Sequence, residues 1–178
     1  NVSPAGSVSR SPSASQVRVV LGQNPGLRTG PGTNTYLLGK ERLVLIDTGA
    51  GVPAYDPLLR AAVTTLGGRL SLILLTHGHS DHMGGLGSVR GMFPDVGARK
   101  FPGEEAVSAV APITAGELIR HDGITLQAIH TPGHATDHLC FYQRTRRSLP
   151  ESPACAALRP LRQDEIAGLI LLDSLAFP

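Results

Sequence analysis

The stretch "LILLTHGHSDHMGGLG", residues 72–87, places three histidines and one aspartate within six positions. They follow an apolar run, precede two adjacent glycines, and are His77, His79, Asp81 and His82. Positions 77, 79 and 81 would share one face of an extended strand, whereas position 82 would point to the opposite face. A helix would instead separate positions 77 and 79. All four side chains can therefore converge only in a loop, which the preceding strand and the glycines supply.

The four side chains have the ligand chemistry of a metal centre. Imidazole nitrogen and carboxylate oxygen suit Zn²⁺, Mn²⁺ or iron, and the lack of thiolates in the motif argues against a structural zinc site. Four groups in one bend exceed what one catalytic ion needs, so we expect two neighbouring ions, about 3.5–4 Å apart as in other dinuclear sites. The alternative is a histidine-rich surface loop, which the spacing and the apolar strand before it disfavour.

A second histidine motif, "HTPGHATDH", occupies residues 130–138. Pro132 and Gly133 exclude a helix there, so His130 and His134 cannot act as a pair one helical turn apart. His134 directly follows the Pro-Gly turn after a strand, in the same way that the first motif follows a strand. We therefore expect His134 to be a further metal ligand.

The other polar groups of this region have structural interpretations. His130 lies on the apolar face of its strand and is expected to be a packed or rim residue. Asp137 and His138 could lie near the site, but we expect them to stabilise the turn. His121 is expected in a hairpin turn, with no functional role.

The apolar runs predict a layered α/β domain with a sheet buried between helices. The run at residues 70–75 is apolar without alternation, which indicates a strand covered on both faces. Further strands are expected at 16–22, 35–39, 42–49, 116–119, 124–129 and 138–143, and helices at 57–66, after Gly85 and at 101–110.

The composition indicates one globular domain. The length of 178 residues suffices for a sizeable core, and 41% hydrophobic with 17% charged residues argues against disorder. No apolar run reaches the ~18–20 residues that cross a bilayer, so we expect a soluble chain with no membrane partner. The formal net charge of +2 is too small to indicate nucleic acid by itself. Two cysteines do not form a disulfide framework, which favours a reducing setting.

The chain divides into three parts by composition. Residues 1–15 are Ser-rich and free of acidic residues, as expected of a disordered tail or the remnant of an organelle transit peptide. Residues 16–143 carry the strands, the helices and both motifs. Residues 144–178 change in character, with five arginines and three prolines before residue 166 and no clear period, and are expected to form a divergent tail.

In combination the motifs resemble those of a known superfamily. "THGHSDH" followed by "MGG", then "TPGH" downstream and "VLIDTG" (44–49) upstream, are similar to the motifs of the metallo-β-lactamase superfamily. The stretch "NPGLRTGPGTNTYLLG" (24–39) resembles a narrower group within it, the β-lactamase-like protein 2 mitochondrial endoribonucleases. The resemblance runs from about Val17 to Tyr142.

The resemblance implies an αββα sandwich with a metal site at one sheet edge. It implies that His77, His79 and His134 hold a first zinc ion. Asp81 and His82 would help to hold a second. Asp47 would orient the ligand loop from outside, as carboxylates behind ligating imidazoles do, or would simply cap the end of its strand.

The implied function is that of a zinc-dependent hydrolase. The narrower group implies an endoribonuclease in the mitochondrial matrix that cleaves single-stranded RNA with a metal-bound hydroxide, Asp81 orienting that water or accepting its proton. DNA is not an expected partner. The alternatives are a thioesterase similar to glyoxalase II and a non-catalytic product that binds a metal ion without turnover. The cytoplasm is the alternative location, and the oligomeric state stays open.

The sequence also departs from the superfamily pattern. The Gly-Asp pair that would supply a bridging aspartate and the final "PGH" are both missing, and no histidine follows His138. Asp173 follows an apolar run as the bridging aspartate would, but no glycine precedes it. We therefore expect a sandwich whose second half is incomplete, with one zinc ion in place of two, in a truncated or divergent member whose activity is open.

Overall fold

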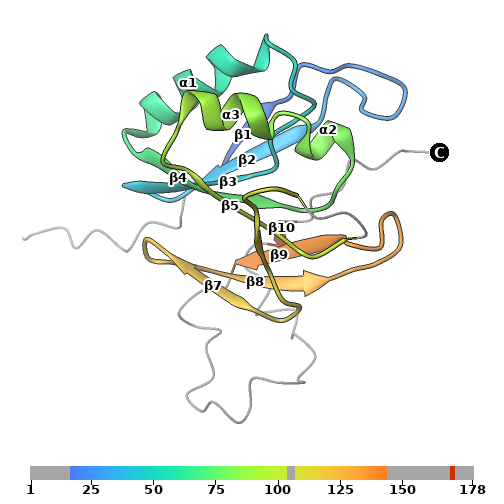
Figure 1. Cartoon of the computed structure of the whole chain (residues 1–178). Helices are drawn as coiled ribbons and strands as arrows, with labels where there is room; N and C mark the ends of the chain where they lie inside the picture. The colour runs from blue at the N-terminus through green and yellow to red at the C-terminus, as the bar shows by residue number, and fades with distance from the viewer. Residues whose placement is uncertain (1–16, 104–106, 144–168, 171–178) are drawn as a thin grey trace, which may run out of the picture.

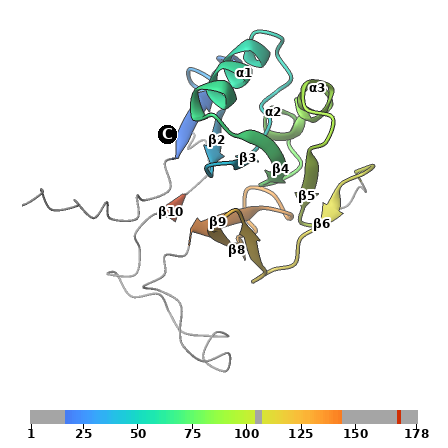
Figure 2. The ribbon, with the colours of Figure 1, turned by 90° about the vertical axis from the view of Figure 1, so that its left-hand side faces the viewer.

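The computed structural model describes residues 17–103 and 107–143 and the backbone of residues 169–170 (Figure 1). The predicted tail at 1–15 and nearly all of the predicted divergent segment at 144–178, including Asp173, lie outside the described residues. Two β-sheets face each other in the described part, and helices cover the outer face of one of them (Figures 1 and 2).

The larger sheet has six strands in chain order, β1 to β6. They are β1 (Arg18–Leu21), β2 (Asn34–Leu38), β3 (Arg42–Ile46), β4 (Arg69–Leu75), β5 (Gly97–Lys100) and β6 (Ala111–Pro112). The pairs from β1 to β3 are antiparallel, and those from β3 to β6 are parallel. The carboxyl ends of β3, β4 and β5 therefore lie at one edge of the molecule, where ligand sites of such sheets form.

The second sheet is antiparallel, with the strand order β10-β9-β8-β7. Its strands are β7 (Leu118–His121), β8 (Ile124–His130), β9 (Leu139–Gln143) and β10 (Leu169–Ile170). Ile124, Leu126 and Ala128 alternate along β8 and are buried against the larger sheet. This period of two is the pattern of a strand with one covered face.

Three helices lie on the outer face of the larger sheet (Figure 2). They are α1 (Tyr55–Leu66), α2 (Ser80–Met83) and α3 (Leu86–Met92). Leu59 and Val63 face the sheet from α1, one turn apart, while Leu58 is exposed. The helix ends at Gly67, whose φ of 70° places it in the left-handed conformation that terminates many helices. None of the described helices is long and apolar enough to span a bilayer.

The larger sheet is buried on both faces. Leu43 and Leu45 of β3 pack towards the helices, and Val44 and Ile46 pack towards the second sheet. In β4 the same division separates Ile73 from its neighbour Leu74. The structure thus confirms the prediction that residues 70–75 form a strand covered on both faces.

The two facing sheets confirm the sandwich that the resemblance implied, and two predictions from the residues alone are wrong. The larger sheet lies between helices and a second sheet, not between two layers of helices, because the strands after residue 117 bury an alternating face of their own. The predicted helix at 101–110 is also wrong, since its described residues, 101–103 and 107–110, are not helical. Pro102 and Gly103 at its start are poor helix formers.

An ion pair joins the larger sheet to the start of the second. Arg99 of β5 donates from Nη1 to Glu117 Oε1 at 2.7 Å and from Nη2 to Oε2 at 3.1 Å. This forked arrangement is the strongest geometry of an arginine–carboxylate pair. The hydrogen bonds from Arg99 hold the pKa of Glu117 below its ordinary value of 4.5.

We predict that the Glu117→Gln change reduces the loss of stability in acid. A carboxylate whose folded-state pKa is lowered stabilises the fold above its ordinary pKa of 4.5, and this stabilisation is lost as the pH falls through the lowered value. The urea midpoint should therefore drop less between neutral pH and about pH 3 in the variant than in the parent chain. Equal drops in both proteins would contradict the prediction.

Candidate metal centre

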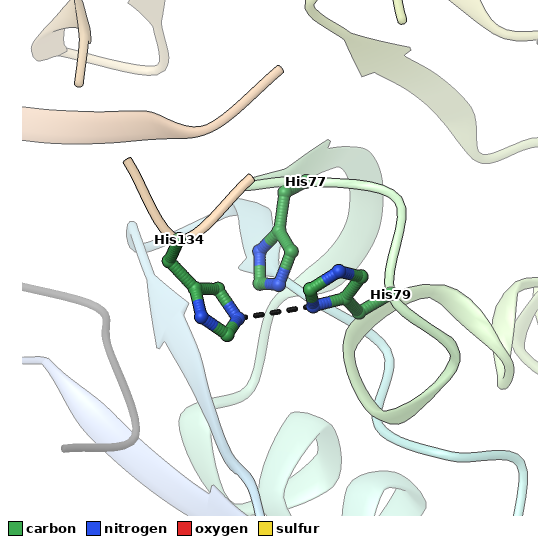
Figure 3. Close-up of side chains that lie close together, drawn as sticks. All are labelled: His77, His79 and His134. Carbon is green, nitrogen blue, oxygen red and sulfur yellow. Dashed lines mark hydrogen bonds between the residues drawn. The ribbon is translucent and has the colours of Figure 1, made fainter. Parts of the chain in front are cut away.

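The candidate metal centre forms where two loops from different sheets meet. One loop follows β4 and carries His77 and His79, and the other joins β8 to β9 and carries His134. The backbone N–H of Leu139, the first residue of β9, donates to the carbonyl oxygen of Thr76 at 2.8 Å. This bond fixes the start of β9 against the end of β4, which brings the two loops together (Figure 3).

Three predicted ligands converge in this place. One nitrogen from each of His77, His79 and His134 lies within 4.8 Å of the other two. His79 Nδ1 and His134 Nε2 are 3.0 Å apart. Three nitrogens around a tetrahedral zinc ion are about 3.3 Å apart, because each Zn–N bond is about 2.0–2.1 Å. The spacing of the three imidazoles therefore fits one divalent cation.

His77 is held as a neutral ligand with its Nε2 available. The side chain is fully buried, its Nδ1 lies 2.9 Å from the hydroxyl of Thr76, and its Nε2 has no hydrogen-bond partner among the described residues. Burial, followed by the charges of the surrounding histidines, lowers the pKa of His77 to about 3. A buried nitrogen without a partner, on a ring that does not protonate, is the donor that a metal ion requires.

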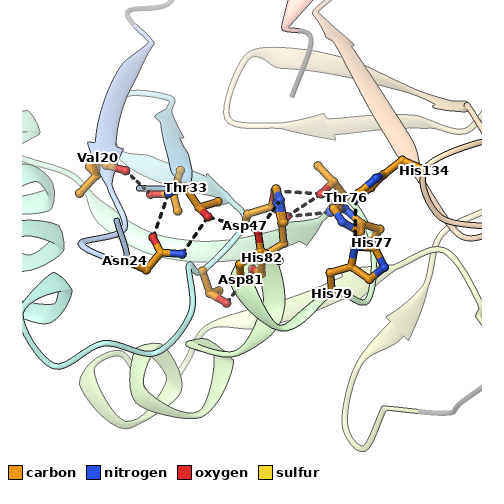
Figure 4. Close-up of polar contacts among 12 residues, drawn as sticks. Val20, Asn24, Thr33, Asp47, Thr76, His77, His79, Asp81, His82 and His134 are labelled. Carbon is orange, nitrogen blue, oxygen red and sulfur yellow. Dashed lines mark hydrogen bonds and ion pairs between the residues drawn. The ribbon is translucent and has the colours of Figure 1, made fainter. Parts of the chain in front are cut away.

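Asp47 determines, through Thr76, which ring nitrogen of His77 carries the proton (Figure 4). Its carboxylate accepts from the Thr76 backbone N–H at 2.8 Å and from the Thr76 hydroxyl at 2.9 Å. An ionised carboxylate can only accept, so the single hydroxyl proton of Thr76 points to Asp47. The Thr76 oxygen then accepts from Nδ1–H of His77, which leaves the lone pair of His77 on Nε2.

Asp47 itself has an unusual backbone. Its φ is 60°, in the left-handed region, and its side chain is fully buried. Asp and Asn enter this region more readily than most residues, and the surrounding hydrogen bonds hold it there. The two interpretations of Asp47 from the sequence were an orienting carboxylate and a plain strand-end cap. The contacts with Thr76 and His82 favour the first.

Asp81 and His82 lie beside the three histidines and form a pair of their own. His82 Nδ1 is 2.8 Å from Asp47 Oδ2, and its Nε2 is 3.6 Å from Asp81 Oδ2. Thr33 of the loop between β1 and β2 also donates to Asp81, at 3.4 Å. Within the described residues the group able to hold one ion consists of the three histidines, so a second ion at Asp81 and His82 stays a prediction.

Close backbone contacts explain why two glycines follow the motif. The Thr48 backbone N–H donates to the His82 carbonyl at 2.8 Å, which brings the loop after β3 against α2. A Cβ on Gly85 would lie 2.1 Å from the Thr48 carbonyl oxygen, and one on Gly84 would lie 2.9 Å from that of Ala50. Both positions need glycine for Asp47 and His82 to remain in contact.

The remaining histidines have other partners. His130 donates to the Thr136 carbonyl at 2.8 Å and stacks on Phe101, so it is a packed residue. His121 ends β7 and bonds Ser71 at 2.7 Å, away from the centre. His138 is buried, with Nδ1 at 2.8 Å from the Thr131 hydroxyl, which supports the expected role in the turn.

Sequence reasoning missed one residue of the centre and one residue beside it. Thr76 directly precedes the motif, and a hydroxyl residue between an apolar strand and a histidine is the only signal of its role. Lys100 ends β5, a strand that was not predicted, and its ammonium group binds Asp137 of the β8–β9 loop. Burial alone would raise the pKa of Asp137, but the hydrogen bond and charge of Lys100 hold it below its ordinary value.

We predict that His134→Ala removes the tight zinc site. Loss of a hydrogen-bond partner behind a ligand usually lowers metal affinity by ~10–100-fold. The variant loses a ligand itself, so its zinc affinity should fall by more than this. A titration against a chelating dye measures this affinity. His121→Ala is the matched control and should bind as the parent does. Parental affinity in the His134 variant would contradict the assignment.

We predict a smaller effect for Thr76→Val. This change retains the β-branched shape and the backbone bonds but removes the hydroxyl that links Asp47 to His77, so zinc affinity should fall by roughly 10–100-fold. Thr76→Ser retains the hydroxyl and should restore the affinity. Equal affinities for the two variants in the same titration would show that the hydroxyl does not orient His77.

Comparison with known proteins agrees with this geometry. Residues 28–100 match the family model of the metallo-beta-lactamase superfamily. The chain is 42% identical over 123 residues to the atrochrysone carboxyl ACP thioesterase nsrC of Aspergillus novofumigatus. The matched region is 68% of this chain and 38% of that protein. It is 40% identical over 123 residues to the lactamase-like protein ptaB of Pestalotiopsis fici, with 68% and 39% covered. The chain thus spans less than two fifths of the length of these relatives.

Solved structures share the fold. ETHE1 from Myxococcus xanthus superposes with a TM-score of 0.57 at 25% identity, covering 72% of this chain and 53% of that one. MEM-A1, a subclass B3 metallo-beta-lactamase from a soil metagenome library, gives a TM-score of 0.57 at 19% identity, with 74% and 56% covered. The match at residues 28–100 and the shared fold show that this chain contains a metallo-beta-lactamase superfamily domain.

Proposed function

We propose that this chain carries the metal-binding part of a hydrolase that cleaves thioesters. The observation that supports the proposal is its identity of 42% over 123 residues to a protein named as an acyl carrier protein thioesterase. A second relative with that name, dmxR1 of a Cryptosporiopsis species, is 44% identical over 128 residues. The thioesterase alternative from the sequence therefore has more support than the endoribonuclease.

The charge around the centre also supports an uncharged reacting group. A cavity beside His79 is lined by a single cationic residue among the described ones, Lys100, and Asp137 neutralises it. Proteins that bind nucleic acids place several cations against consecutive phosphates. A thioester has no charge at its reacting carbon, so this lining suits it better than a phosphodiester.

The residues of the centre have separate roles in such a reaction. His77, His79 and His134 would hold a divalent cation, which supplies a Lewis acid and lowers the pKa of a bound water when present. Asp81 lies at the edge of the centre with its side chain 31% exposed, where its carboxylate can accept a proton from the attacking water. Water adds to the thioester carbonyl carbon, the C–S bond breaks, and the products are a carboxylic acid and a thiol.

We predict that the zinc-loaded chain releases thiol from N-acetylcysteamine thioesters and leaves labelled single-stranded RNA intact. Asp81→Asn should lower kcat by about 10²–10⁴-fold, the usual contribution of a positioned base, while zinc binding at the three histidines persists. The matched control is His121→Ala, which should turn over as the parent does. Thiol release is followed with a chromogenic disulfide.

Three results would contradict the proposal. Cleavage of RNA without thioester hydrolysis would establish the endoribonuclease in its place. Tight zinc binding with no turnover of either substrate would establish the non-catalytic alternative. Thioester hydrolysis that is equal in the parent and the Asp81→Asn variant would remove Asp81 from the mechanism.

A further inference from the structure

A cavity of about 510 Å³ lies next to the metal centre. Its lining joins the ligand loop, through Gly78 and His79, to the end of β5 and to the β8–β9 loop. The volume falls within the ~300–1,000 Å³ that is usual for small-molecule sites. Because His79 is both a lining residue and a candidate metal ligand, the cavity adjoins the candidate metal centre.

Half of the ten lining residues are apolar or glycine and half are polar, and the polar half includes one buried ion pair. Met83, Val107 and Ala135 contribute apolar surface, while Lys100 and Asp137 contribute the charges. Both charged residues are buried, at 6% and 8% exposed. A buried lysine and a buried aspartate on the wall of a cavity form a built polar site, in contrast to solvated side chains on a surface.

Lys100 retains a donor for a ligand in this cavity. An ammonium group has three N–H donors. One goes to the Asp137 carboxylate and a second to the Phe101 carbonyl, at 3.0 Å. The described residues supply no acceptor for the third, so a group inside the cavity can take it.

Two glycines hold the ion pair in place from either side. A Cβ on Gly103 would lie 3.2 Å from both Lys100 Nζ and Asp137 Oδ2, and one on Gly78 would lie 3.2 Å from Asp137 Oδ2. Their backbones therefore pack closely against the pair, and the two hydrogen bonds of Lys100 hold its ammonium group at the cavity wall.

The charge balance of the pair selects the type of acceptor. A carboxylate or phosphate that approached Lys100 would also meet the carboxylate of Asp137, and that repulsion would offset the attraction. A ketone or hydroxyl oxygen accepts the same hydrogen bond without repulsion. The apolar side chains of the lining, Met83, Val107 and Ala135, suit the carbon chain that carries this oxygen.

We propose that this cavity binds the acyl part of the thioester and that Lys100 selects acyl chains carrying an uncharged oxygen over plain hydrocarbon chains. The inference rests on the proposed thioesterase function for the reaction, and on the lining residues alone for the selectivity. Lys100 is thus a specificity-determining residue, and it takes no part in the bond-breaking step.

The test compares four N-acetylcysteamine thioesters of equal chain length. They are those of octanoic, 3-oxooctanoic, 5-oxooctanoic and 7-oxooctanoic acid, and thiol release gives kcat/KM for each. At least one oxo substrate should exceed octanoyl by about tenfold or more, the usual effect of a hydrogen bond to a charged group. Because the 3-oxo group also activates the thioester chemically, the 5-oxo and 7-oxo substrates carry the comparison.

Paired variants separate the donor from the fold. Lys100→Met combined with Asp137→Leu replaces the buried pair with apolar side chains, a change that buried ion pairs often tolerate. This double variant should hydrolyse octanoyl as the parent does and lose the preference for the oxo substrate. Arg99→Met combined with Glu117→Leu removes the neighbouring pair outside the cavity and should keep the preference.

Binding provides a readout that does not depend on turnover. The N-propyl amides of the same acids are not hydrolysed, and NMR titration of the chain gives their affinities. A preference for an oxo amide that the Lys100/Asp137 double variant loses supports the inference, even if no thioester is cleaved and the proposed function fails. Equal affinities for all four amides in the parent would overturn the inference, whether or not thioesters are hydrolysed.

Discussion

Thr76 joins the parts of this molecule on which the metal centre depends. Its backbone carbonyl accepts from Leu139 and so ties the second sheet to the first, and its backbone N–H donates to Asp47. Its hydroxyl binds Asp47 on one side and His77 on the other. Four bonds at one residue thereby determine where the two sheets meet, how the buried imidazole is oriented, and which of its nitrogens is free.

The fold predicted from sequence is correct where the apolar pattern is long and wrong where elements are short. The run at 70–75 has six residues without alternation, and it is a strand covered on both faces. By contrast, β5 is the four residues "GARK", in which a buried lysine and an arginine in an ion pair conceal the strand from any reading of hydrophobicity. The strands of the second sheet and the hairpin turn near His121 were predicted from the sequence, and two facing sheets were implied by the resemblance, but the pairing of strands far apart in the chain leaves no local signal.

The site was predicted to a similar extent. The spacing of the four ligand candidates at positions 77, 79, 81 and 82 required a loop. The Pro-Gly turn singled out His134 over His130, which in the structure stacks on Phe101. The sequence could not reveal that Lys100 binds Asp137, since Lys100 ends a strand of the larger sheet and Asp137 lies in a loop of the second sheet, 37 residues away. Nor could the sequence decide the role of Asp47, because an aspartate stands at the end of the strand whether it orients a ligand or only caps the strand.

The centre has a dry side and a wet side. His77 is buried behind Thr76 and Asp47, whereas His79 and His134 are exposed. Electrostatic interactions are stronger on the dry side, where water does not screen them. The open side, which His79 shares with the neighbouring cavity, is the side from which a substrate can approach.

The origin of the ligands in two different sheets has a thermodynamic consequence. A cation bound by the loop after β4 and by the β8–β9 loop would act as a clasp between the two layers, because separating the layers would break its coordination. Any ion that binds only the assembled form must stabilise it, by about 2.7 kcal/mol when its free concentration is a hundred times its dissociation constant. The stability of the packing between the two sheets would then increase with the occupancy of the metal centre. A shortage of the ion would weaken this packing as well as remove the Lewis acid.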